Sequence, residues 1–427
     1  MIRDRRAILA LLTALNFINY IDRAVIAAVL KPMRGELALS NFEAGLLNTA
    51  FLIGYFVTSP WFGARADKSA RMGLIALGVV IWSVATVASG LASGFWSLLA
   101  ARIVVGVGEA SFTVLAPTVI DDLMPAGNKG KALAVFFLAI PLGYAMGYIL
   151  GGSIAHHWGW RTAFVFVGGP GVVLALTCLL IAEPARKLLD ARARLVDGLR
   201  EMIGIPLFRR AVLGYCAYVA AVAGFSYWAP NFLLERFPGR LNDETANFWF
   251  GVVLIAAGAI GTFAGGQWTD RGQRALPAAA ADAPYDAPES KAAVNVALRV
   301  CAAGMAVAAP LAALCFVLPS PMVFFVVAFV VEIGVFLSTS PINLAIMRAV
   351  PVERRASAVA ASVFAIHLFG DLWSSAALGL LQDVLPIIIA MMAIPLTFAW
   401  SAYIWWPRER EAAGTGGPPQ AQVRPAT

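Results

Sequence analysis

Long apolar segments separated by short polar stretches follow one another along almost the whole chain. An α-helix needs about 20 apolar residues to cross a hydrocarbon core of about 30 Å, because each residue adds only ~1.5 Å. Twelve segments meet this requirement, at approximately residues 7–29, 42–63, 72–91, 95–117, 132–154, 161–182, 209–235, 244–268, 293–317, 321–346, 356–380 and 384–406. The pattern predicts an all-α polytopic membrane protein with twelve transmembrane helices.

Composition agrees with this pattern and offers no sign of an enzyme. Of the 427 residues, 60% are hydrophobic and 13% are charged, whereas soluble domains contain about 45–50% apolar and about 25% charged residues. The glycines of Gly106-Val-Gly108 lack the strand–turn–helix context of a nucleotide site, and no nucleophile motif stands at a strand end. We therefore expect neither enzymatic activity nor a cofactor.

The basic residues indicate how the chain crosses the membrane. The net charge is +7, and with both termini in the cytoplasm 25 of the 32 Lys and Arg residues fall on the inner side. Two more lie at membrane depth, and the outer loops hold only Lys31, Arg34, Arg161, Arg236 and Arg240. This bias follows the positive-inside rule, so the basic charge indicates topology and no nucleic-acid partner.

The start of the chain predicts an uncleaved first helix. Met1–Arg6 precedes a full-length span without a small-residue cleavage site, unlike a secretory signal peptide. From the compactness of the chain we expect an integral protein of a bacterial inner membrane, present as a monomer.

The chain consists of two similar halves. Gly63–Lys68 after the second span matches Gly266–Arg271 after the eighth, and a pattern at Pro125–Leu142 recurs 226 residues later, at Pro351–Leu368. We expect six-helix bundles at 1–182 and 209–406, an amphipathic cytoplasmic linker at 183–208, a disordered loop near 276–290 and a disordered cytoplasmic tail at 407–427. Two halves of six spans related in parallel form the architecture of the major facilitator superfamily.

The first span carries polar residues that a membrane helix normally avoids. Asn16, Asn19, Asp22 and Arg23 lie inside its apolar sequence. A charge at this depth costs at least ~2.5–3.5 kcal/mol, so such residues usually face a bundle interior or an aqueous cavity and mark function. A structural ion pair that locks helices together is the alternative.

The fourth span offers partners for these charges. Arg102, Gly106, Glu109 and Thr113 fall on one narrow helical face at 100° per residue. Asp22 and Arg102 lie at the same depth if the two spans run in opposite directions. We therefore predict a balanced cluster of two acids and two bases, Asp22, Arg23, Arg102 and Glu109, that acts as a coupling site.

Further candidates lie in the second half. His367 and Asp371 share one face of the eleventh span at i, i+4 spacing, and form either a cavity-lining, pH-sensitive pair or a structural one. A metal site needs further ligands, which are not apparent. Aromatic residues of the seventh span, including Tyr218 and Trp228, predict an apolar wall opposite Arg23 and Arg102.

Two cytoplasmic loops and a row of glycines are candidates for contacts that change during transport. Asp67 and Asp270 end equivalent helices, and each carboxylate would accept hydrogen bonds from the N-terminal amides of a helix in the other half, with Arg71 and Arg271 beside them. Glycines at four-residue spacing in the fifth span, Gly143, Gly147 and Gly151, permit close helix contact. That contact is either sliding or static packing.

These motifs resemble one branch of a known family. The loops at Asp67 and Asp270 are similar to the signature loop of the major facilitator superfamily, and Asn19-Tyr-Ile-Asp22-Arg23 with Arg102…Gly106-Val-Gly108-Glu109 resembles its spinster-like branch. The resemblance implies transport of lysolipids, such as sphingosine 1-phosphate or lysophospholipids, coupled to protons. It also implies protonation of Asp22 and Glu109 and headgroup contact by Arg23 and Arg102.

The expected function is therefore secondary active transport of an amphipathic anionic lipid, with protons and the bilayer as the other partners. A proton symporter for a small organic anion, such as a sugar acid, is the alternative, because Asn-Tyr-x-Asp-Arg also occurs in such symporters. A non-transporting receptor or scaffold is a third hypothesis, but a buried charge cluster and two repeated gate loops have no purpose there.

Overall fold

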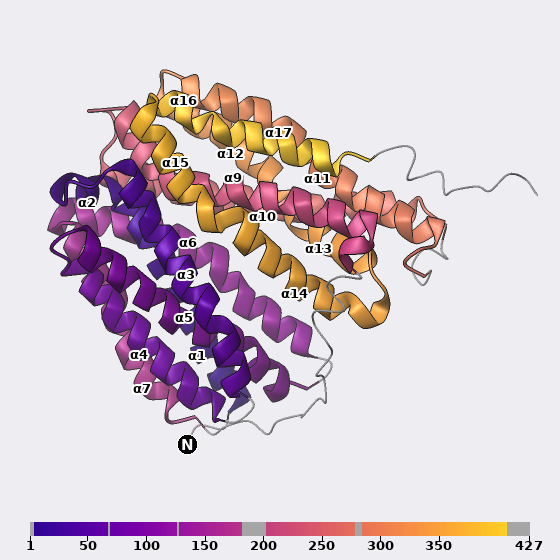
Figure 1. The fold of residues 1–427 in the computed structure, drawn as a ribbon, viewed down its shortest axis with the longest axis horizontal. Helices are drawn as coiled ribbons and strands as arrows, with labels where there is room; N and C mark the ends of the chain where they lie inside the picture. Colours follow the sequence, from indigo (N-terminus) through magenta and orange to yellow (C-terminus); the bar gives the residue numbers. More distant parts are fainter. Residues whose placement is uncertain (1–3, 67–68, 126–127, 182–201, 278–283, 408–427) are drawn as a thin grey trace, which may run out of the picture.

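In a computed structural model the chain folds into two bundles of α-helices, shown in Figure 1. The structure describes residues 4–66, 69–125, 128–181, 202–277 and 284–407, and all statements below concern these residues. The first bundle contains α1 (Arg5–Ala28), α2 (Leu30–Glu36), α3 (Asn41–Ala66), α4 (Arg71–Gly90), α5 (Phe95–Leu123), α6 (Lys129–Trp158) and α7 (Trp160–Cys178). It corresponds to the first predicted half.

The second bundle follows the same order of spans. It contains α9 (Pro206–Arg236), α10 (Asp243–Arg274), α11 (Pro288–Val317), α12 (Pro321–Phe336), α13 (Thr339–Arg348), η3 (Val352–Arg354), α14 (Arg355–Ile366), η4 (His367–Asp371), α15 (Leu372–Val384), α16 (Ile387–Met391) and α17 (Ala393–Trp405). The predicted amphipathic helix and the tail fall almost entirely outside the described residues, as does part of the predicted loop near 276–290.

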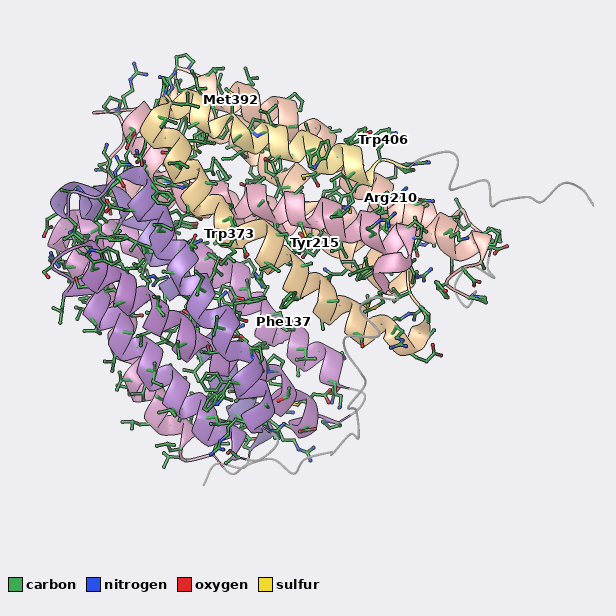
Figure 2. The ribbon with its side chains drawn as sticks, viewed as in Figure 1. Phe137, Arg210, Tyr215, Trp373, Met392 and Trp406 are labelled. Atoms are coloured by element: carbon green, nitrogen blue, oxygen red, sulfur yellow. The ribbon has the colours of Figure 1, made fainter. Side chains whose placement is uncertain are left out.

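Eleven of the described helical segments are long and apolar enough to cross a membrane, and a twelfth is reached if α2 and α3 count as one bent span. The all-α fold predicted from the sequence is therefore confirmed. Helices suit this setting because they satisfy every backbone polar group within the segment. Large apolar side chains such as Phe137, Trp373 and Trp406 remain exposed on the bundles, as expected of a protein surrounded by lipid (Figure 2).

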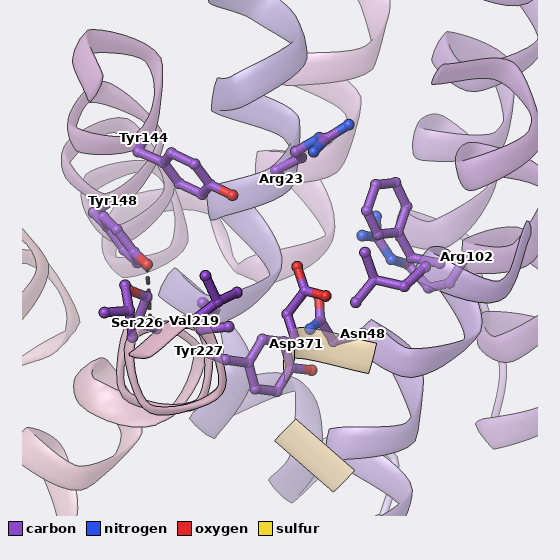
Figure 3. Close-up of a pocket in the computed structure, with 14 residues that line it drawn as sticks. Arg23, Asn48, Arg102, Tyr144, Tyr148, Val219, Ser226, Tyr227 and Asp371 are labelled. Carbon is purple, nitrogen blue, oxygen red and sulfur yellow. Dashed lines mark hydrogen bonds between the residues drawn. The ribbon is translucent and has the colours of Figure 1, made fainter. Parts of the chain in front are cut away.

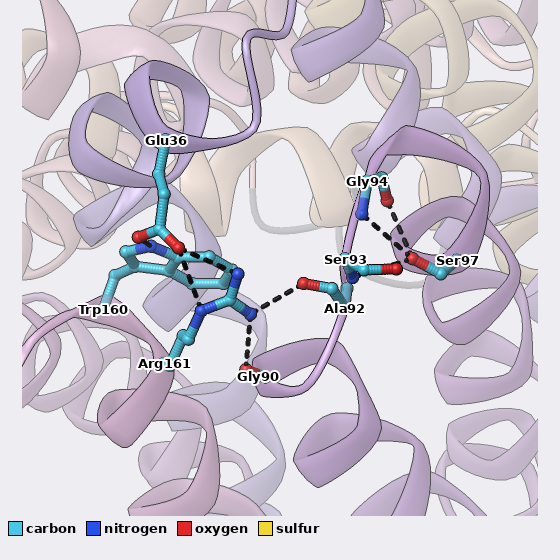
Figure 4. A network of polar contacts seen from close by, with 8 residues as sticks. All are labelled: Glu36, Gly90, Ala92, Ser93, Gly94, Ser97, Trp160 and Arg161. Atoms are coloured by element: carbon cyan, nitrogen blue, oxygen red, sulfur yellow. Dashed lines mark hydrogen bonds and ion pairs between the residues drawn. The ribbon is translucent and has the colours of Figure 1, made fainter.

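A polar network holds the end of α2 against α4 and α7 inside the first bundle. The carboxylate of Glu36, at the end of α2, accepts hydrogen bonds from Trp160 Nε1 at 2.7 Å and from Arg161 Nη2 at 2.9 Å. Arg161 also donates to the carbonyl oxygens of Gly90 and Ala92, so one guanidinium joins α2, α4 and α7 (Figure 4). This end of the first bundle is thus held together as one rigid unit.

The glycines of α6 serve two different contacts. A Cβ at Gly143, Gly147 or Gly151 would lie within 2.9 Å of atoms of α1, so this row packs inside the first bundle. Gly152 instead faces the second bundle, where a Cβ would lie 2.6 Å from that of Asn247 in α10. The predicted glycine row therefore packs against α1 of its own bundle along most of its length and makes a cross-bundle contact only at Gly152.

The two bundles touch mainly along two helix pairs, α6 with α10 and α3 with α15, and α9 adds smaller contacts with α1 and α2. Cross-bundle hydrogen bonds gather where α2 lies: Asn48 donates to Ser375, Thr49 to the carbonyl of Leu372, and Asn247 to the carbonyl of Ala28. We call this the closed end of the molecule. Away from it the two bundles diverge, as Figure 1 shows.

A substitution at Gly45 would test how tightly α3 and α15 pack at the closed end. A Cβ at this position of α3 would lie 2.3 Å from the carbonyl oxygen of Ser375 in α15. We expect Gly45→Ala to lower thermal stability in detergent, because overpacking typically costs ~1–3 kcal/mol. Gly63→Ala on the same helix is the control, since its Cβ would meet only a methyl group at 3.9 Å. Equal melting temperatures for the two variants would contradict the prediction.

Candidate functional site

Two acid–base pairs lie buried within the first bundle. Arg23 Nε lies 2.7 Å from Glu109 Oε2, and Arg102 Nη1 lies 3.8 Å from Asp22 Oδ1. The side chains of Asp22, Arg102 and Glu109 are at most 1% exposed, and that of Arg23 is 13% exposed. The structure thus brings together the four residues of the predicted cluster across α1 and α5. The Asp22–Arg102 pair agrees with their predicted common depth, whereas the Arg23–Glu109 pair was not predicted.

Local packing explains why these four side chains meet. Asp22 and Arg23 are consecutive in α1, so they point about 100° apart and reach different partners on α5. Gly106 lets α5 approach α3, because a Cβ there would lie 2.0 Å from the carbonyl oxygen of Phe51. Gly108 plays the same part toward α4. These contacts fix α5 against α3 and α4, and from that position Arg102 and Glu109 reach Asp22 and Arg23 on α1.

Aromatic and hydroxyl groups complete the surroundings of the cluster. The guanidinium carbons of Arg23 and Arg102 each lie 5.1 Å from the ring centre of Phe51, and Arg23 also lies over Tyr20 and Tyr55. Thr86 of α4 donates a hydrogen bond to Asp22 Oδ2. Thr86 was not predicted from the sequence, where nothing distinguishes it from other threonines in apolar spans.

A cavity of about 220 Å³ opens between the bundles beside this cluster (Figure 3). The first bundle contributes Arg23 and Arg102 to its lining, and the second contributes Asp371. Three of the predicted binding residues therefore face one space. The lining also includes Tyr227, one of the seventh-span aromatic residues expected on this wall, and residues that the sequence analysis missed, namely Asn48, Tyr144, Tyr148 and Ser226. Tyr144 and Tyr148 stand four residues apart beside the glycine row of α6, which was the available signal.

Two of the tyrosines that line the cavity also join the bundles. Tyr148 of α6 donates to the carbonyl of Ser226 in α9 at 2.8 Å, and Tyr227 of α9 donates to the carbonyl of Ala44 in α3 at 2.6 Å. Both side chains line the cavity. The wall of the cavity toward the closed end is thus made by the residues that tie the bundles together.

The other predicted residues of the first bundle serve varied roles. Asn19 is fully buried beside Glu109. Asn16 donates to the carbonyl of Phe136 at 2.8 Å and so links α1 to α6, while Thr113 donates to the backbone carbonyl of Glu109. Neither Asn16 nor Thr113 belongs to the cavity lining.

In the second bundle the predicted pair forms, whereas the two aromatic residues lie elsewhere. His367 Nδ1 lies 2.9 Å from Asp371 Oδ2, inside a π-helical turn, His367–Asp371, that interrupts the eleventh span. Tyr218 and Trp228 are buried within the bundle, where they donate to the carbonyls of Val335 and Ser375. These two aromatic side chains are not part of the cavity lining.

The predicted gate residues that the structure describes lie at the end of the molecule opposite the closed end. Asp67 falls outside the described residues. Arg71 is buried and pairs with Asp122 of α5 at 2.7 Å, within its own bundle. Asp270 and Arg271 are exposed at the end of α10. The described residues contain no group of three or more His, Cys, Asp or Glu side chains arranged for a metal ion.

Comparisons with known proteins agree with this architecture. Residues 12–374 match the family model of the Major Facilitator Superfamily. A probable sphingolipid transporter, spinster homolog 2 of Arabidopsis thaliana, is 29% identical over 94% of this chain and 87% of its own length. Human spinster homolog 1 is 29% identical over 88% of this chain and 72% of its own length. The predicted resemblance to spinster proteins is confirmed.

A solved structure has the same fold. It is a bacterial homologue of the human lysosomal transporter spinster, in an inward-facing and occupied conformation. It superimposes with a TM-score of 0.81, at 23% identity, and the match covers 95% of this chain and 97% of the other.

The buried ion pair provides a test of the site's energetics. Glu109→Gln leaves the buried Arg23 guanidinium without its counter-charge, which typically costs ~3–5 kcal/mol. We expect a large drop in thermal stability from Glu109→Gln and partial recovery in the double variant with Arg23→Met. Asp121→Asn, which breaks the more exposed Lys129–Asp121 pair, is the control and is expected to cost at most ~1 kcal/mol. Additive losses in the double variant would show that the pair is not coupled.

Proposed function

The chain belongs to the major facilitator superfamily and is a membrane transporter related to the spinster proteins; from this premise we propose that it moves an amphipathic anionic lipid by alternating access, coupled to protons. One observation supports this proposal above the others. The cations that face the cavity, Arg23 and Arg102, are the same groups that neutralise the buried carboxylates Glu109 and Asp22. An anion in the cavity therefore competes with both carboxylates.

The guanidinium groups have hydrogen-bonding capacity left for such an anion. Nη2 of Arg23 and Nε and Nη1 of Arg102 are buried and make no hydrogen bond with the described residues. An unsatisfied charged donor is costly inside a protein, so a phosphate or carboxylate headgroup that accepts from these atoms is strongly favoured. We assign headgroup binding to Arg23 and Arg102.

The opposite wall suits the remainder of an amphipathic molecule. Val219, Val222 and Ala223 of α9 line the cavity and offer an apolar surface for an acyl chain. Asp371 lies among them, with Oδ1 buried and without a hydrogen bond to the described residues. It would accept a hydrogen bond from an ammonium or hydroxyl group of the headgroup, and His367 would orient it.

Proton coupling follows from the shared cations. When a headgroup draws Arg23 or Arg102 away, Glu109 or Asp22 loses its counter-charge and takes up a proton, because a buried carboxylate without a cation favours its neutral form. When the headgroup leaves, the guanidinium returns and the proton is released. Asp22 and Glu109 are thus the proposed proton carriers, with Asn19 beside them.

The predicted topology indicates which side of the membrane the cavity faces. With cytoplasmic termini, as the basic residues predict, the closed end lies on the outer side and the cavity faces the cytoplasm. Asp67 and Asp270, with Arg71 and Arg271, remain proposed gate residues for the inner side. We place the protein in a bacterial inner membrane.

A small organic anion is the alternative substrate, and the cavity size favours it. The volume of about 220 Å³ lies below the ~300–1,000 Å³ of most ligand pockets. A sugar acid would fill this space alone, whereas a lysolipid would extend its chain beyond the enclosed part.

Proton coupling is tested with charge-removing variants. We expect Asp22→Asn and Glu109→Gln to abolish uphill transport driven by a pH gradient in proteoliposomes, while substrate exchange without a gradient continues in part, since exchange needs no net protonation. Asp121→Asn, an acid far from the cluster, is the control and keeps wild-type uptake. Gradient-driven uptake that survives in both variants would contradict the proposed carriers.

The substrate class is tested with a chain-length series. Binding of lysolipids is expected to strengthen with each added CH₂, by up to ~0.8 kcal/mol where the group is buried. Arg102→Ala should weaken binding at every chain length by a similar factor, because it removes a contact to the headgroup and none to the acyl chain. Isothermal titration against chainless and long-chain anions measures both effects. Equal affinity for short and long anions would favour the organic-anion alternative.

A further inference from the structure

The first turn of α3 is only partly capped by its own bundle. The N–H groups of a helix's first turn need partners from outside the helix ladder. Ser40 is the N-cap: its hydroxyl accepts from the amide of Glu43 at 3.1 Å, and its own amide donates to the Glu43 carboxylate at 2.9 Å. The amides of Asn41 and Phe42 remain for a partner outside this capping box.

The second bundle supplies that partner. Asp383, in the last turn of α15, accepts a hydrogen bond from the amide of Asn41 at Oδ1 and another from the amide of Phe42 at Oδ2, each of 2.9 Å. One carboxylate therefore completes the capping of a helix that belongs to the other bundle. A negative charge at this position also interacts favourably with the helix dipole.

The backbone of α15 is shaped for this approach. Gly379 stands one turn before Asp383, and a Cβ there would lie 2.2 Å from the carbonyl oxygen of Asn41. Any larger residue would hold the two helix ends apart and move the Asp383 carboxylate out of reach of the amides. The glycine and the aspartate together form a single contact surface for the start of α3.

We propose that Asp383 is a gating residue of the closed end, which holds the bundles together by capping α3 and releases that cap when this end opens. The inference rests on alternating access from the function proposed above, but on neither the lipid nor the proton. Opening separates α15 from α3, and the amides of Asn41 and Phe42 then exchange a charged acceptor for water. The capping box of Ser40 and Glu43 stays intact in both states because both residues belong to α3.

Other bonds at this end are less suited to the role. Arg34 and Glu235 form a 2.7 Å ion pair across the bundles, in which both partners are long side chains. Asp383 is more exposed than either of them, so exposure does not separate the two contacts, whereas side-chain length does. Ion pairs of this kind contribute little, because ordering both long side chains costs entropy. Asp383 has a short side chain and binds two rigid backbone amides, so it loses less freedom on closing.

The test measures the opening of this end in the full-length chain without substrate. Spin labels at Leu91→Cys and Met322→Cys, both on exposed positions of the two bundles, report the distance across the closed end. The four native cysteines are buried, so they do not compete for the label. We expect Asp383→Ala, and the isosteric Asp383→Asn, to raise the ratio of open to closed populations roughly five-fold.

Glu43→Ala is the matched control. It weakens the capping of the same helix turn from within its own bundle, in both states alike, and should leave the distance distribution unchanged. Wild-type distributions in both Asp383 variants would overturn the proposal, as would an equal shift in Glu43→Ala. A shift in the Asp383 variants together with no transport of any lysolipid would leave the gate standing and remove the proposed substrate. Wild-type lysolipid transport with no shift in the distance distribution would support the proposed substrate and overturn the proposed gate.

Discussion

The cost of placing charge at membrane depth is the constraint on which this structure depends. Asp22 and Glu109 could not remain ionised in an apolar bundle, and Arg23 and Arg102 could not be dehydrated without counter-charges. Their pairing across α1 and α5 meets both requirements at once. Gly106 and Gly108, next to the charged residues of α5, hold that helix against α3 and α4 and so fix the position of Arg102 and Glu109.

Contacts within each bundle differ in kind from contacts between the two bundles. Contacts within a bundle rest on buried ion pairs and long glycine rows, which are costly to break. Contacts between the bundles include many single hydrogen bonds from a side chain to a backbone carbonyl, as with Thr49, Tyr148 and Tyr227, beside one partly exposed ion pair and isolated glycine contacts. Each such bond can be replaced by water at small cost. The bundles are therefore suited to move as rigid bodies about a cavity that lies between them.

The amino-acid sequence predicts the parts of this protein whose physics is local. The length of each apolar run determines a span, and helical periodicity together with depth pairs Asp22 with Arg102. Neither pattern assigns the cavity lining, since Asn48, Tyr144 and Ser226 meet only through the packing of the two bundles. Tyr218 and Trp228 were predicted to line the cavity but are buried within the bundle. An aromatic residue suits a bundle core as well as a binding wall, and the spacing of these two residues does not distinguish the two positions. The cap from Asp383 joins residues more than 340 positions apart, beyond the reach of any local pattern.

That separation along the chain has a consequence for how the protein is made. A ribosome adds about 5–20 residues per second, so on the order of 20–70 s pass between the synthesis of α3 and that of Asp383. Throughout this interval the newly inserted first bundle exposes two amides and the faces of α3 and α6, with Gly45 and Gly152, that will later meet the second bundle. The membrane surface or a chaperone must cover them meanwhile. During biogenesis the first bundle is thus synthesised well before the second bundle, with which it will pack.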